Sequence, residues 1–298
     1  MLCYKHKIAL YLPQNVTPMQ KPLILVTNDD GIFAKGIRVL VEAMCAIGEV
    51  VVVAPNTPQS AKGHAITLSE PLRLRKSTLF GANVAAYECS GTPVDCVKLA
   101  KHVILKGRKP DLCVSGINHG SNASINIIYS GTMSAAMEGA VEDILSIGFS
   151  LDDFHSDADF EPCKPFILKI ATFLLQNPME KTKLLNVNFP KLPLQAIKGI
   201  KLCRQAEGRW IEEFQEGKDP AGRTYYWLTG KFVNLDKGKD TDIHALQAGY
   251  VSVVPSGHDL TDYQGLTELK KMQFESEHLL FSDPNRIEIK GQPSQNDV

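Results

Sequence analysis

Short apolar runs alternate with amphipathic segments along the first two thirds of the chain. Residues 23–27 and 49–55 are apolar and rich in β-branched side chains, without the alternation of a half-buried strand. Between them, residues 36–47 repeat apolar side chains at helical spacing and precede Gly48, a typical helix stop. Strands that are apolar on both sides predict a parallel sheet covered by helices on both faces.

The same alternation continues to about residue 204, and the pattern then changes. Thr92, Pro93 and Asp95 have the residue types of an N-cap, N1 and N3, so they predict the start of a helix. Further strands are expected at 110–116, 146–151, 184–190 and 197–203, and further helices from Ser130 and over 164–175. Residues 205–264 are aromatic and β-branched with turns between them, which is typical of a β-rich appendage.

These patterns predict four parts. They are an N-terminal extension (1–20), a Rossmann-like α/β core that carries the active site (21–204), a β-rich appendage (205–272) and a flexible tail (273–298). The apolar segment in the extension is short and broken by Pro13, so it predicts a loose extension rather than an export signal or a membrane span.

Composition narrows the class of protein. The chain has 298 residues, is 44% hydrophobic and carries a formal net charge of -1, which is typical of an ordinary globular protein. A charge near zero gives no general attraction to nucleic-acid polymers or membranes. The seven cysteines include no C-x-x-C pair, so we expect a reduced, cytoplasmic protein without a disulfide framework or zinc site.

Polar side chains gather where the predicted strands end. Asp29 and Asp30 follow the first strand, Ser60 lies in the loop after the second, and Asn118 follows the strand at 110–116. Ligands bind at the carboxyl ends of strands in open parallel sheets. Two carboxylates about 4 Å apart repel by about 4 kcal/mol at an intermediate dielectric. This repulsion is removed either when one of them takes a proton or when a cation lies between them. Oxygen ligands favour a hard divalent cation such as Mg²⁺, Mn²⁺ or Ca²⁺. The simpler alternative is that one aspartate caps the following turn and the other is solvated.

Ser130, Gly131 and Thr132 form a turn that opens a predicted helix. Ser130 or Thr132 can cap this helix, and the N–H groups of a helix N-terminus bind phosphate without a lysine. Beside two carboxylates and a cation, a phosphate is the natural bridging ligand. Residues 90–95 have the same design, but there we expect capping only.

The segments "TNDDGI", "GTPVDCV", "SGINHGSN" and "YSGTMSAAMEG" resemble, in this order, the SurE family of 5′/3′-nucleotidases. The resemblance covers residues 23–151 and continues more loosely through "LNVNFP", Thr241–Asp242 and "GYVSVVP". It implies a Rossmann-like core, a β appendage with a swapped C-terminal segment that serves oligomerisation, and a homodimer or homotetramer. It also implies a phosphatase for nucleoside 5′- and 3′-monophosphates with one divalent metal ion per subunit, Mg²⁺ or Mn²⁺.

The resemblance also implies roles for individual residues. The metal ligands fall on Asp29, Asp30, Ser60 and Asn118, of which the two aspartates are also the catalytic candidates. The phosphate contacts fall on Asn118, Ser130, Gly131 and Thr132. Two departures stand out, because Ala61 replaces a frequent glycine and His258 lies one residue from the position where many relatives carry a histidine.

Several alternatives remain open from the sequence. The nucleophile is either a water activated by the cation or an aspartate. A phosphotransferase of the haloacid dehalogenase type fits less well, because it requires D-x-D. A nucleotide- and metal-binding regulatory protein without turnover, or a phosphatase that also accepts short polyphosphate, are the remaining alternatives. Base and sugar preference and the physiological metal are not readable from the sequence.

Overall fold

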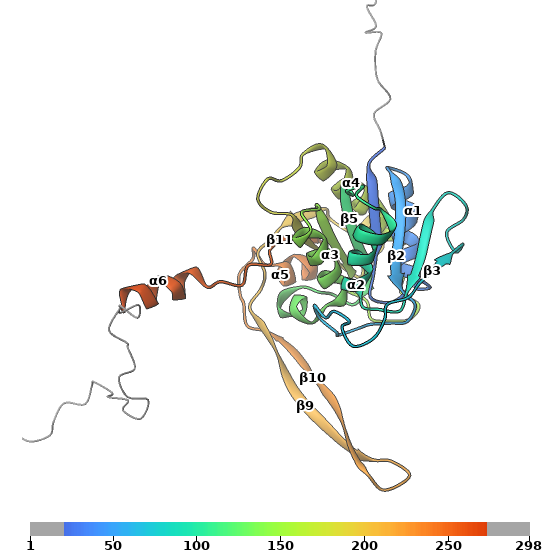
Figure 1. Cartoon of the computed structure of the whole chain (residues 1–298). Helices are drawn as coiled ribbons and strands as arrows, with labels where there is room; N and C mark the ends of the chain where they lie inside the picture. The colour runs from blue at the N-terminus through green and yellow to red at the C-terminus, as the bar shows by residue number, and fades with distance from the viewer. Residues whose placement is uncertain (1–20, 273–298) are drawn as a thin grey trace, which may run out of the picture. The chain divides into compact units, whose positions relative to one another are not determined.

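The core of the protein is one mixed sheet, seen in Figure 1 in a computed structural model that describes residues 21–272. Its nine strands are ordered β3-β4-β2-β1-β5-β6-β7-β11-β8. The pairings from β4 through β7 are parallel, whereas β3 and β11 run antiparallel to β4 and β7. The strands are β1 Leu23–Thr27, β2 Glu49–Pro55, β3 Leu74–Ser77, β4 Ala85–Cys89, β5 Leu112–His119, β6 Ser146–Leu151, β7 Leu184–Phe189, β8 Ile200–Leu202 and β11 Val251–Ser256.

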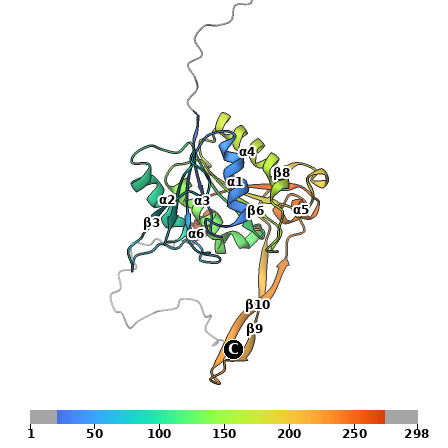
Figure 2. The ribbon, with the colours of Figure 1, turned by 90° about the vertical axis from the view of Figure 1, so that its right-hand side faces the viewer.

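Helices cover both faces of the interior of this sheet, which explains why β1 and β2 are largely apolar. Along β1, Ile24 and Val26 pack in the cluster that contains the side chains of α1 and α4, whereas Leu23 and Leu25 pack in the cluster that contains those of α2. Successive side chains of a strand point to opposite faces, so both sets must be apolar. Figure 2 shows α1 (Lys35–Cys45) beside α4 (Lys164–Gln176), while α2 (Pro93–Leu99) packs against α3 (Gly131–Val141). The predicted α/β architecture is confirmed.

Local capping residues mark the starts of α2 and α3. The Thr92 hydroxyl accepts the N–H of Asp95, and the Asp95 carboxylate accepts the N–H of Thr92 in return. This capping box confirms the predicted start of α2, which continues past Leu99 as a π-helical turn, Ala100–Ile104. Of the two residues expected to cap α3, Ser130 and Thr132, it is Ser130 whose hydroxyl oxygen accepts the N–H of Met133. Short 3₁₀ turns lie at Ser124–Tyr129, Glu161–Cys163 and Leu194–Ala196.

The β-rich appendage is smaller than the sequence analysis indicated. It consists of an antiparallel hairpin, β9 (Gly208–Lys218) and β10 (Thr224–Asn234), which projects from the main sheet in both views. The following α5 (Asp242–Gln247) packs on β11, and β11 lies inside the main sheet between β7 and β8. The assignment of this last strand to the appendage was therefore wrong, because an apolar strand has the same pattern in a hairpin and in a sheet interior. The edge strand β3 and its neighbour β4 were not anticipated.

The chain divides into two units, Met1–His258 and Asp259–Val298. In the second unit the structure describes α6, Tyr263–Lys271, whose first turn is capped by the Asp262 carboxylate. The expected N-terminal extension (1–20) and tail (273–298) lie outside the described residues. Within residues 21–272, none of the helices is both long and apolar enough to cross a bilayer.

Candidate active site

The turn after β1 presents the two adjacent carboxylates. Gly31 adopts a left-handed conformation (φ 94°), which a residue with a side chain rarely adopts, and lies against the backbone that follows β2. The Asn28 side chain closes the turn by donating its Nδ2–H to the Gly31 carbonyl over 2.9 Å. The turn thus holds Asp29 and Asp30 at the carboxyl end of β1, an interior strand that lies between β2 and β5.

Asp29 is buried, with 3% of its surface exposed. Burial and the neighbouring charge of Asp30 raise its pKa from 3.8 to about 6, although hydrogen bonds from Thr132 oppose this rise. The Thr132 hydroxyl donates to Asp29 Oδ1. An ionised carboxylate in this position is therefore destabilised by its surroundings unless a positive charge accompanies it.

Asp30 and Asn118 lie together at the ends of β1 and β5. The backbone N–H of His119 donates to Asp30 Oδ2 over 3.3 Å, and burial raises the pKa of Asp30. Asn118 Nδ2 donates to the carbonyls of His119 and Gly120 over 3.0 and 2.8 Å. Since both amide hydrogens are used on the backbone, the Asn118 Oδ1 atom is left as an acceptor for a ligand.

Ser60 comes from the loop after β2, residues 56–73, which we call the Ser60 loop. The Gln59 N–H donates to the Asp29 backbone carbonyl over 2.7 Å, so the beginning of the loop lies against the acidic turn. Ser60 is exposed and lines the same cavity as Asp29. Ala61, one of the departures noted in the sequence, has φ 58°, a left-handed conformation that favours glycine.

The N-terminus of α3 closes the other side of the site. A Cβ atom on Gly131 would lie 2.7 Å from the Asp29 Cβ, so only glycine allows this close approach. Thr132 was expected to contact phosphate, but its hydroxyl is directed to Asp29. Among the hydrogen bonds of the described residues, the Gly131 N–H has none, so it is available to a ligand.

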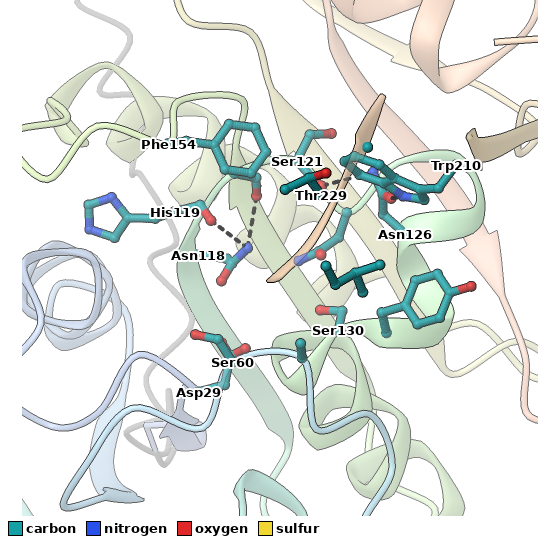
Figure 3. A pocket seen from close by; sticks show the side chains of 16 residues that line it. Asp29, Ser60, Asn118, His119, Ser121, Asn126, Ser130, Phe154, Trp210 and Thr229 are labelled. Carbon is teal, nitrogen blue, oxygen red and sulfur yellow. Dashed lines mark hydrogen bonds between the residues drawn. The ribbon is translucent and has the colours of Figure 1, made fainter. Parts of the chain in front are cut away.

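These groups surround one end of a cavity of about 620 Å³ (Figure 3), a volume suited to a small molecule. Four of the seven predicted residues line it directly, namely Asp29, Ser60, Asn118 and Ser130. The other three lie beside these residues. Thr132 donates to Asp29, Gly131 packs closely against Asp29, and Asp30 accepts the N–H of His119, the neighbour of Asn118.

The other end of the cavity is lined by residues that the sequence analysis did not identify. Trp210 and Thr229 come from the hairpin, and Asn126 from the 3₁₀ turn before α3. Trp210 Nε1–H donates to Asn126 Oδ1 over 2.8 Å, which fixes the indole ring (Figure 3). The aromatic run of the hairpin was the only signal in the sequence. His258 is not among the described residues that line the cavity.

The donor set fits a hard divalent cation. Two carboxylates, an amide oxygen and a hydroxyl offer oxygen atoms alone, which is the chemistry that Mg²⁺ and Mn²⁺ prefer. Within residues 21–272, no group of three His, Cys, Asp or Glu side chains is placed to hold a metal. A site here would therefore depend on the neutral ligands as well as on the acidic pair. Asn28 Oδ1 adds a buried oxygen that has no hydrogen-bond donor in the described part.

Comparisons with known proteins agree with this arrangement. A family model described as "Survival protein SurE" matches residues 24–212. A 5′-nucleotidase SurE of Cytophaga hutchinsonii is 60% identical over 253 residues, which cover 85% of this chain and 97% of that protein. One of Bacteroides thetaiotaomicron is 46% identical, covering 84% and 95% of the two chains. The crystal structure of the SurE protein from Aquifex aeolicus superposes with a TM-score of 0.73 at 40% identity, covering 84% and 99%.

Proposed function

Because the chain belongs to the SurE family, we propose that it is a 5′-nucleotidase, which hydrolyses the phosphomonoester of nucleoside monophosphates to nucleoside and inorganic phosphate. The observation that carries the proposal is the buried Asp29, whose raised pKa and contact with the N-terminus of α3 suit a site where cation and phosphate meet. The activity toward 3′-monophosphates that the resemblance implied is part of the proposal.

We assign one divalent cation per subunit, Mg²⁺ or Mn²⁺, to four oxygen ligands, namely Asp29, Asp30, Ser60 and Asn118. The cation, when bound, supplies positive charge for the phosphate oxygens and lowers the pKa of a nearby water. The Thr132 hydroxyl holds the Asp29 carboxylate in place. Thr132 therefore orients a residue that binds the cation and does not itself contact the substrate. The two carbonyls that accept from Asn118 orient its amide in the same way.

The phosphate is expected at the N-terminus of α3. The Gly131 N–H and the positive end of the helix dipole stabilise the charge that develops on the phosphoryl oxygens. Ser130 lines the cavity at this point, although its hydroxyl oxygen already accepts the N–H of Met133. The hydroxyl hydrogen of Ser130 can still be donated to a phosphoryl oxygen, so both residues bind and orient the phosphoryl group.

Asp30 is the better candidate for accepting a proton from the attacking water. Asp29 is committed to Thr132, whereas the hydrogen bond that Asp30 receives from the His119 N–H is long, at 3.3 Å. The rival route is direct attack by an aspartate on phosphorus. A phosphorylated carboxylate, recovered from the protein after rapid acid quenching, would favour that route over attack by water.

The nucleoside is expected at the end of the cavity that the hairpin lines. Trp210 offers an aromatic face whose ring is fixed by Asn126, and a base stacks favourably on such a face. The cavity reaches from this ring to Asp29, so one ligand can contact both ends.

We further propose a homo-oligomer, a dimer or tetramer, in the cytoplasm. Several large apolar side chains of the hairpin are more than 60% exposed, namely Phe214, Tyr226, Trp227 and Leu228. A second copy that covers them removes apolar surface from water. The six cysteines of the described range are free thiols, as in a reducing compartment.

Phosphate release from a panel of nucleoside monophosphates, with Mg²⁺, Mn²⁺ or EDTA, tests the proposal. We expect release with either metal, none with EDTA, and recovery when excess metal is returned. The rival is a regulatory protein that binds nucleotide and metal without turnover. Nucleotide binding without phosphate release would favour this rival, and release from short polyphosphate would extend the substrate range.

A further inference from the structure

The Ser60 loop contributes a proposed cation ligand, yet the loop has no secondary structure of its own to hold that residue in place. Residues 56–73 lie between β2 and β3 outside any helix or strand, and most of them are exposed. Ala61, directly after Ser60, has a left-handed backbone that is unfavourable for alanine by about 1–2 kcal/mol. Such a conformation persists only when the surrounding structure imposes it.

Two buried carboxylates hold the loop a few residues beyond Ser60. Glu138, 3% exposed, lies 3.0 Å from His64 Nε2. Asp95, 2% exposed, accepts both the backbone N–H and the hydroxyl of Thr67, over 3.2 and 2.6 Å. Because a buried carboxylate is stabilised by each hydrogen bond that it accepts, both contacts favour the loop conformation in which His64 and Thr67 reach these carboxylates.

Glu138 also has a second partner, the ammonium group of Lys98. Its other oxygen, Oε1, accepts from Lys98 Nζ of α2. The carboxylate therefore keeps a partner when His64 is removed, so a His64 variant does not leave an unpaired buried charge. A substitution of His64 therefore removes the contact between the loop and Glu138 and leaves the contact between Lys98 of α2 and Glu138 of α3 in place.

Helix α3 connects this anchor to the acidic pair. Thr132 in its first turn donates to Asp29, and Glu138 lies six positions later, about 9 Å along the same helix. One rigid element thus fixes both a carboxylate ligand and the loop that carries Ser60.

We propose that His64, through Glu138, positions Ser60 relative to the acidic pair and so sets the affinity of the site for a divalent cation. The inference rests on the proposed function, because it takes Ser60 as a cation ligand. His64 acts as a positioning residue, since it reaches the site through the loop backbone.

The test is the Mn²⁺ dissociation constant of the full chain, measured by titration calorimetry for the wild type, His64→Ala and His64→Gln. We expect His64→Ala to weaken Mn²⁺ binding about tenfold. His64→Gln retains an N–H for Glu138 and is expected to restore binding to within about threefold of the wild type.

The matched control is His102→Ala, which removes a histidine 3.5 Å from Glu142 at the end of α3 without touching the Ser60 loop. It should leave the dissociation constant unchanged. If His64→Ala lowers the melting temperature but binds Mn²⁺ like the wild type, the contact is only structural and the inference is overturned. If the wild type binds no Mn²⁺, the proposed function itself fails.

Discussion

Replacing Asp29 with asparagine tests the electrostatics of the site without activity as the only readout. Burial and the charge of Asp30 raise the pKa of Asp29 from 3.8 to about 6. At about 1.4 kcal/mol per pH unit, the ionised side chain lowers the stability of the metal-free protein by roughly 3 kcal/mol at pH 7. Asparagine keeps the shape and the acceptor for Thr132 but carries no charge.

Metal-free Asp29→Asn should therefore be more stable than the wild type at pH 7. Roughly 1 kcal/mol is lost because the new amide hydrogens need acceptors, which leaves a gain of about 2 kcal/mol. At an unfolding entropy of about 2.1 cal/mol/K per residue over 298 residues, the gain corresponds to a rise of roughly 3 °C in Tm. With saturating Mn²⁺ the order should reverse, because only the wild type is stabilised by binding.

The pH dependence has a defined sign. A carboxyl group whose pKa is higher in the folded than in the unfolded state lowers the free energy of unfolding when it ionises. For Asp29 this loss is absent below about pH 4, grows up to about pH 6 and is complete above it. The penalty at pH 5 is about half its value at pH 7, so after the same loss of about 1 kcal/mol the gain from Asp29→Asn should be about a third as large at pH 5 as at pH 7. The assay is thermal unfolding in EDTA, with Asp157→Asn as an exposed control. A metal-free Asp29→Asn that is less stable than wild type at pH 7, or that still gains stability from Mn²⁺, would refute the reasoning.

Three further predictions concern other parts of the molecule. Asp30→Asn should lower phosphate release at least about a hundredfold with an unchanged circular dichroism spectrum; near-normal turnover would contradict its assigned role. Trp210→Ala should raise KM for nucleoside monophosphates about tenfold at similar kcat, because base stacking contributes about 1–3 kcal/mol, while KM for phenyl phosphate stays unchanged. Equal effects on both substrates would argue against a base contact. Trp227→Ser should shift sedimentation toward monomer, and an unaltered assembly would exclude this side chain from the interface.

Part of the fold could be predicted because it depends on local chemistry. The run at 23–26 is apolar at every position, which only a strand covered on both faces requires, and β1 is such a strand. Thr92 and Asp95 cap each other within one turn, so their signal needs no distant partner. The acidic pair was found for the same reason, since it directly follows the strand that presents it.

Long-range partners were decided by the tertiary structure. Thr132 meets Asp29 across 103 residues of sequence and Trp210 meets Asn126 across 84, so neither contact has a local pattern. The position of β11 between β7 and β8 was hidden in the same way.

The sequence by itself determined which segments are buried and which polar residues follow the strands, because hydrophobic periodicity and capping report burial and local backbone conformation. Only the tertiary structure decided which neighbour each segment buries against. That choice directs Thr132 to Asp29, brings the hairpin to the cavity and ties the Ser60 loop to α3. Side-chain partners follow from three-dimensional packing, which the spacing of residues along the chain does not encode.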